Sequence, residues 1–94
     1  MTKRCERIEQ KGQVFAIVIR RGFSKPGVHF FTPGEFSQQL AMLVHAKGKV
    51  VDRHRHKPVR REILRTQEVL VVLSGRVKIQ IYSDEGTLLR AVIL

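Results

Sequence analysis

The chain has 94 residues, 43% of them apolar and 28% charged, which suits one small globular domain over residues 1–94 and excludes an intrinsically disordered chain. Its longest purely apolar run, residues 14–19, is too short for a membrane-spanning helix, and residues 1–10 lack the apolar core of a signal peptide. A single cysteine, Cys5, allows no internal disulfide, so we expect a cytoplasmic protein. Without a membrane-spanning segment, no membrane partner is expected either. The net charge of +10 favours anionic partners.

The first half of the chain predicts strands and one short helix. Residues 13–20 (QVFAIVIR) are rich in β-branched and aromatic side chains and predict a strand, and residues 22–30 predict an irregular loop with Gly and Pro. A short helix is expected near residues 33–40, with Thr32 as its N-cap and Pro33 in the first position. Residues 41–51 return to strand composition.

The second half predicts only strands and turns. Residues 66–73 (TQEVLVVL) and 76–82 (RVKIQIY) predict two strands of a hairpin joined by Ser74-Gly75. A turn at residues 83–86 leads to a last strand, residues 87–94. Short strands with short turns are typical of an antiparallel sandwich or barrel. Because the sequence ends inside an apolar strand, we expect either a piece of a longer chain or pairing with another subunit.

Two histidines, His54 and His56, lie in the basic stretch DRHRHKP. On a strand, residues two apart point to the same face, so both imidazoles could bind one metal while Arg53 and Arg55 point away. The alternative is a pair of surface histidines. Glu68 opens an otherwise apolar strand, where a carboxylate needs a metal or an ion pair with a nearby arginine. Two histidines and one carboxylate are the ligands of many open metal sites.

The spacing Gly48-x5-His54-x-His56, followed by Glu68-x6-Gly75, resembles the first motif of the cupin superfamily. The resemblance covers about residues 41–94, and it implies an all-β fold: a small antiparallel β-barrel, or jelly roll, in which these histidines and Glu68 bind a divalent metal ion such as Fe, Mn, Ni or Zn. Two features depart from the family. Eleven residues separate His56 from Glu68, more than is usual, and no second motif with a fourth ligand follows before Leu94. A long basic loop and a barrel incomplete in one chain are therefore expected.

Three functions follow from these features. The first is a cupin-type metal-binding domain with a pocket for a small anionic or sugar-derived molecule, which Arg60, Arg61 and Arg65 would bind as anion ligands. If it is an enzyme, the resemblance implies a metal-dependent cupin or a sugar-nucleotide isomerase or epimerase. The second is a truncated, non-catalytic cupin that forms a structural homodimer through its C-terminal strand. The third, less supported by the sequence, is a basic β-barrel that binds nucleic acid.

Overall fold

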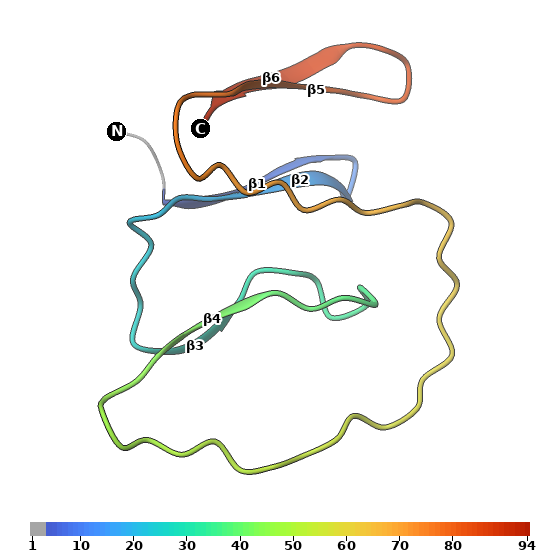
Figure 1. Cartoon of the computed structure of the whole chain (residues 1–94). Helices are drawn as coiled ribbons and strands as arrows, with labels where there is room; N and C mark the ends of the chain where they lie inside the picture. Colours follow the sequence, from blue (N-terminus) through green and yellow to red (C-terminus); the bar gives the residue numbers. More distant parts are fainter. Residues whose placement is uncertain (1–3) are drawn as a thin grey trace. The chain divides into compact units, whose positions relative to one another are not determined.

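The computed structural model describes residues 4–94, which form an all-β protein of six strands in three antiparallel hairpins (Figure 1). The strands are β1 (Cys5–Gln10), β2 (Gln13–Ile19), β3 (Gly27–Phe30), β4 (Ala41–Val44), β5 (Lys78–Tyr82) and β6 (Leu88–Ile93). Each hairpin is a two-stranded sheet of its own, and residues 4–94 contain no closed barrel. They also contain no helix, and hence none able to cross a membrane.

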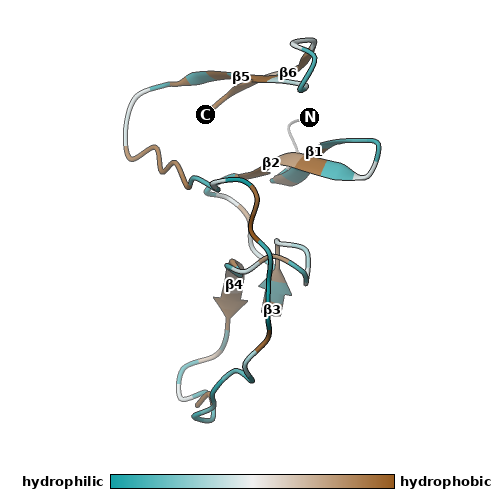
Figure 2. Ribbon diagram, turned by 90° about the vertical axis from the view of Figure 1, so that its right-hand side faces the viewer, coloured by the Kyte–Doolittle hydropathy of each residue, from teal (hydrophilic) through white to brown (hydrophobic). Residues whose placement is uncertain are grey.

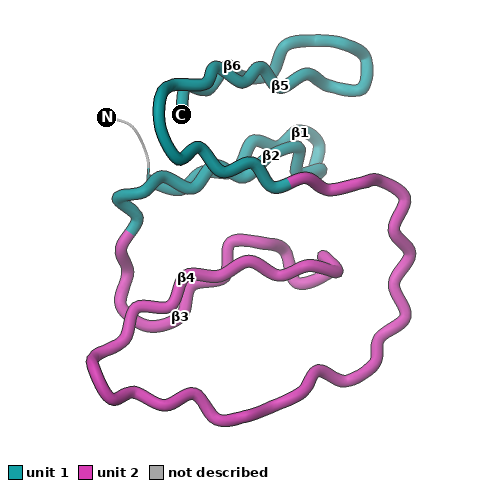
Figure 3. The backbone as a smooth tube through the Cα atoms, viewed as in Figure 1, with its two compact units in different colours: residues 1–23, 69–94 teal, residues 24–68 magenta. Residues whose placement is uncertain are grey.

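The chain divides into two compact units, coloured separately in Figure 3. The first unit comprises residues 1–23 and 69–94 and carries the hairpins β1–β2 and β5–β6. The second unit comprises residues 24–68 and carries the hairpin β3–β4 followed by a long loop. The residues expected to bind metal and anions all belong to this second unit.

The hairpin β1–β2 is closed by a two-residue turn at Lys11-Gly12. Both residues have positive φ angles, 51° and 77°, and Gln10 pairs with Gln13 across the turn. Such a turn matches the right-handed twist of its strands, and glycine adopts its backbone angles without strain. The predicted strand at residues 13–20 is confirmed by β2, whereas β1 was not predicted.

A small apolar core holds the two hairpins of the first unit together. Ile8, Val18 and Val92 are buried in one cluster. The partly buried side chains packed against this cluster are Ala16, Ile81, Leu89 and Leu94. Except for Leu89, which lies at a register shift of β6, strand alternation places these side chains on one face of each hairpin, so the first unit is two hairpins packed face to face.

Two polar contacts also join these hairpins. The Arg90 guanidinium donates two hydrogen bonds, each 3.1 Å, to the two carboxylate oxygens of Glu6. Arg20 donates from one terminal nitrogen to the Ile93 carbonyl at 2.9 Å. Both arginines thus reach from one hairpin of the first unit to the other and add polar contacts to the apolar core.

The predicted hairpin around Ser74-Gly75 is wrong. Residues 66–73 form no strand, and β5 pairs instead with β6, Gln80 lying opposite Ala91. The turn that closes this pair is well bonded, because the Ser83 amide donates to the Thr87 carbonyl at 2.8 Å and the Thr87 amide donates to the Ser83 hydroxyl at 3.1 Å. The predicted last strand is confirmed by β6.

The predicted helix at residues 33–40 is also wrong. These residues form a bonded loop between β3 and β4. The Thr32 hydroxyl accepts a hydrogen bond from the Leu40 amide, 3.1 Å away, and donates one to the Gln39 side chain at 2.7 Å. The Gln39 amide group in turn donates to the carbonyls of Pro33 and Phe36. The hydroxyl expected to cap a helix therefore closes the loop instead.

Candidate functional site

The sequence-predicted site lies in the loop of residues 45–68, the yellow-green segment of Figure 1. All of these side chains are exposed, and none of these residues belongs to a strand. Only residues 41–44 of the strand predicted at 41–51 are formed, as β4. Figure 2 shows that hydrophilic residues dominate this loop and that apolar residues interrupt them.

The structure brings His54 and His56 together although they are not on a strand. Their ring centroids are 5.5 Å apart, and the ring planes make an angle of 76°. The Nδ1 atom of His54 lies 2.9 Å from the Asp52 carbonyl oxygen. Because a carbonyl can only accept, Nδ1 carries the proton of this bond, and in the neutral ring the lone pair is on Nε2.

That hydrogen bond is the kind of contact that prepares a histidine for metal binding. A metal-binding imidazole commonly donates its second ring nitrogen to a carbonyl or carboxylate, which fixes the tautomer and the ring orientation. This role of Asp52 could not be predicted from the sequence, because its backbone carbonyl is used and not its side chain. His54 is thus oriented with Nε2 available.

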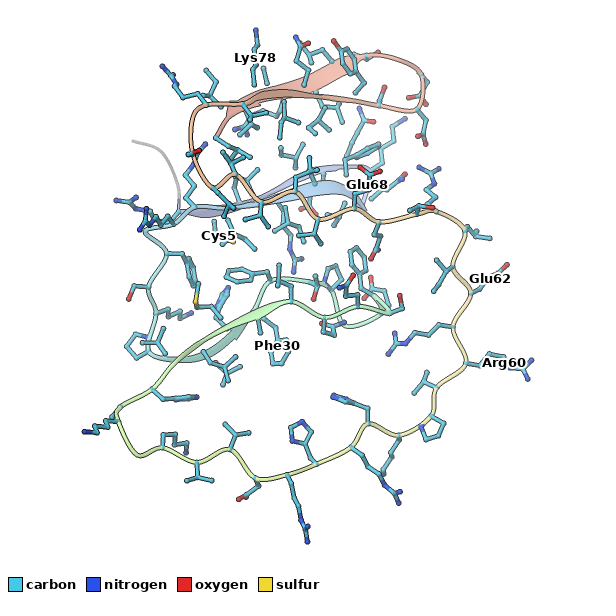
Figure 4. The ribbon with its side chains drawn as sticks, viewed as in Figure 1. Cys5, Phe30, Arg60, Glu62, Glu68 and Lys78 are labelled. Atoms are coloured by element: carbon cyan, nitrogen blue, oxygen red, sulfur yellow. The ribbon has the colours of Figure 1, made fainter. Side chains whose placement is uncertain are left out.

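Glu68 is not brought to the histidines. It lies exposed at the end of the loop (Figure 4), and within the described residues no group of three His, Cys, Asp or Glu side chains is close enough to hold one metal ion. The alternative, an ion pair between Glu68 and an arginine, is not formed in residues 4–94 either. The structure therefore assembles two of the three predicted ligands.

Two of the three predicted anion ligands lie together. Arg61 and Arg65 line a hollow of about 300 Å³ in the second unit. Its other lining residues are Glu35, Phe36, Ser37, Glu62, Ile63, Leu64 and Gln67. Arg61 also donates to the Glu35 carbonyl at 2.7 Å. Arg60 does not line the hollow, and its side chain extends outward from the loop (Figure 4).

The remaining titratable candidates lie outside this site. Cys5 of β1 is half-buried, and burial raises the pKa of its thiol, with Arg7 lowering and Glu6 raising it to lesser extents. His29 of β3 packs edge-on against Phe31, with ring centroids 5.0 Å apart. The ring of His29 therefore packs against Phe31 within the second unit.

Comparisons with protein-family models, with curated proteins and with solved structures found no match.

Proposed function

We propose that this protein is a cupin-type domain that binds one divalent metal ion through His54 and His56, with Glu68 as the third ligand. The observation that carries the proposal is the hydrogen bond from His54 Nδ1 to the Asp52 carbonyl, since it leaves Nε2 free beside the His56 ring. The cupin-like spacing of these residues and Gly75 supports the same ligand set.

The donor set fits a divalent transition metal. Two imidazole nitrogens and a carboxylate oxygen suit Fe, Mn, Ni or Zn, and three protein ligands leave positions open for a small molecule. A metal ion bound there would polarise an oxygen atom of that molecule. Arg61 and Arg65 would orient an anionic group of the molecule by charge-assisted hydrogen bonds.

Metal binding on this proposal is coupled to ordering of the loop. Glu68 has to approach the histidines, and the exposed loop that separates them has few contacts to lose. When a metal site is not formed in advance, part of the free energy of metal binding is used to fold the segment that carries the ligands. The chain after Glu68, Val69–Leu73, would then join a sheet as the strand that a closed jelly-roll barrel requires.

The test is the metal content of the purified protein, measured by elemental analysis, beside that of two double variants. We expect about one divalent ion per chain in the wild type and in His29→Ala/His45→Ala, and none in His54→Ala/His56→Ala. The control variant removes the other two histidines of the chain, so both double variants lose the same number of imidazole groups. Equal metal content in all three proteins, or none in any, would refute the proposal.

The third ligand is tested by two matched carboxylate variants. Glu68→Gln is expected to weaken Zn²⁺ or Mn²⁺ binding by about tenfold or more, whereas Glu62→Gln is expected to leave it unchanged. Each substitution removes one carboxylate, so the two have equal effects on net charge. Both glutamates are exposed in the same loop, so their surroundings are also matched. Weakening by Glu62→Gln alone would assign the third ligand to Glu62.

A second candidate is a structural homodimer. The observation that favours it is the strand β6, which within residues 4–94 pairs with β5 alone and exposes Leu88 and Ile93. An apolar strand edge of this kind pairs readily with another chain. Sedimentation equilibrium is expected to show a dimer that Ile93→Lys dissociates, and a monomeric wild type would exclude this candidate.

A further inference from the structure

The second unit carries more positive charge than a metal site explains. We define the basic loop as residues 47–61, which contain seven Lys or Arg residues and one carboxylate, Asp52. The basic loop thus holds a net charge of +6 out of the +10 of the whole chain. Cations next to a metal site disfavour the bound metal ion, so the proposed metal binding does not account for this charge.

Six of these cations are free to bind a partner. The side chains of Lys47, Lys49, Arg53, Arg55, Lys57 and Arg60 are exposed. In the part of the chain that the structure describes, none of the six forms an ion pair or a side-chain hydrogen bond. Arg61 differs from them, because it donates to the Glu35 carbonyl.

The spread of these cations requires a long partner. Fifteen residues of extended chain span up to about 50 Å, and strand-like residues two apart lie about 6.6 Å from each other. A single phosphate or carboxylate would contact only two or three of the cations. A linear polyanion can contact all six.

We propose that the basic loop binds single-stranded nucleic acid, its lysines and arginines contacting successive phosphates. The exposed guanidinium groups of Arg53, Arg55 and Arg60 are planar and weakly hydrated, so bases can stack on them. A loop without helix or strand offers no rigid element for the major groove of a duplex and no apolar helical face for a membrane. It can follow a flexible single strand. None of the proposed metal ligands takes part.

The experiment is a fluorescence titration of a labelled oligoribonucleotide of about 20 nucleotides, long enough to cover the loop, in the presence of EDTA. Six phosphate contacts to a single strand predict a slope of about −4 for log K against log salt concentration. Between about 50 and about 200 mM salt, affinity is then expected to fall by about 300-fold.

Two quadruple variants with the same net charge locate the surface. Lys49→Gln/Arg53→Gln/Arg55→Gln/Lys57→Gln removes four cations of the basic loop, and the slope is expected to fall to about −1.4. The control variant is Arg21→Gln/Lys25→Gln/Arg76→Gln/Lys78→Gln, which removes two exposed arginines and two exposed lysines elsewhere. It is expected to keep a slope of about −4.

Three results would overturn the proposal. Equal loss of affinity in the two variants would show that overall charge, not the basic loop, attracts the oligonucleotide. Competition by heparin at equal charge concentration would show a general polyanion site. Tighter binding to phosphatidylserine vesicles than to RNA would show a membrane surface. Equally strong binding of a labelled oligodeoxyribonucleotide of the same length supports the proposal, because phosphates and bases are common to RNA and DNA. The thermal transitions of both variants, which replace only exposed side chains, serve as the folding control.

Discussion

At the scale of single residues, the charges that flank the proposed metal ligands are expected to change the affinity of the site for a metal ion. Arg53 and Arg55 adjoin His54 on both sides, and their guanidinium groups repel a divalent cation. Arg53→Gln/Arg55→Gln is therefore expected to tighten Zn²⁺ binding by about 3- to 10-fold at low ionic strength and by less in high salt. Isothermal titration calorimetry measures the Zn²⁺ affinity of the wild type and the variant at both salt concentrations. Weaker binding in the variant would mean that the arginines hold the histidines in place.

The surroundings of Cys5 lower the reactivity of its thiol as a nucleophile. Burial raises the pKa of its thiol, and only the thiolate is nucleophilic. Alkylation by iodoacetamide near pH 8 is expected to be slower in the folded protein than in the same chain in urea, and the folded-state rate is expected to keep rising at higher pH. A raised thiol pKa in the folded state also means that this residue favours folding less as the pH rises above its unfolded pKa. Equal rates with and without urea would contradict this.

At the scale of elements, the turn of β1–β2 offers a simple way to stabilise the protein. Lys11 has a positive φ of 51°, which a lysine adopts at some cost, whereas asparagine adopts it readily before glycine. Lys11→Asn is expected to raise the free energy of unfolding by about 0.5 kcal/mol, and Gly12→Ala to lower it by about 1 kcal/mol. Urea denaturation followed by circular dichroism measures both. A loss of stability in Lys11→Asn would indicate that the lysine side chain makes a needed contact.

The ion pair between β1 and β6 contributes less to the free energy of unfolding than its two hydrogen bonds suggest. The Arg90 side chain is 47% exposed, so solvent screens its bidentate pair with Glu6. A double-mutant cycle with Glu6→Gln and Arg90→Gln is expected to give a coupling of about 0.5 to 1 kcal/mol at low salt. In about 1 M salt the coupling should fall further. A coupling unaffected by salt would mean that the hydrogen bonds, not the charges, join the hairpins.

The sequence predicted those strands whose residues both prefer the extended conformation and have a partner strand in the structure. The strands β2 and β6 were predicted almost to their ends, since their apolar and β-branched residues also form the buried core. Residues 66–73 have equally strong strand composition but no partner, and a strand exists only when it is paired. The strand β1 was missed because Ile8 alone among residues 6–10 is apolar, although Lys11-Gly12 is a recognisable hairpin turn.

The candidate site was predictable only in its local part. His54 and His56 are two residues apart and lie outside any helix, and their ring centroids are 5.5 Å apart although no strand forms there. The position of Glu68 depends on how eleven exposed residues fold, and no local preference determines that. The metal affinity of Glu68→Gln therefore tests its part in the site.

At the scale of the whole molecule, little apolar surface is buried. Within residues 4–94 the buried apolar side chains are Ile8, Val18, Phe31 and Val92, and many large apolar residues of the loop and of Val69–Leu73 are exposed. Monomeric proteins seldom expose large contiguous apolar patches without a use for them. Metal-coupled closure of the loop would give the exposed segment after Glu68 a sheet to pack against.

Two valine-to-alanine substitutions test that closure, because they remove the same atoms from opposite environments. Val92 is 4% exposed and Val71 is 72% exposed. In metal-free protein, Val92→Ala is expected to lower the free energy of unfolding by about 2 kcal/mol, and Val71→Ala by less than about 0.5 kcal/mol. With saturating Zn²⁺, the cost of Val71→Ala is expected to rise above about 1 kcal/mol, since a closed barrel would bury that side chain. Chemical denaturation with and without the metal gives all four values. If Val71→Ala costs equally little in both conditions, metal binding does not add residues 69–73 to a sheet, and the His54 and His56 site works within an open loop.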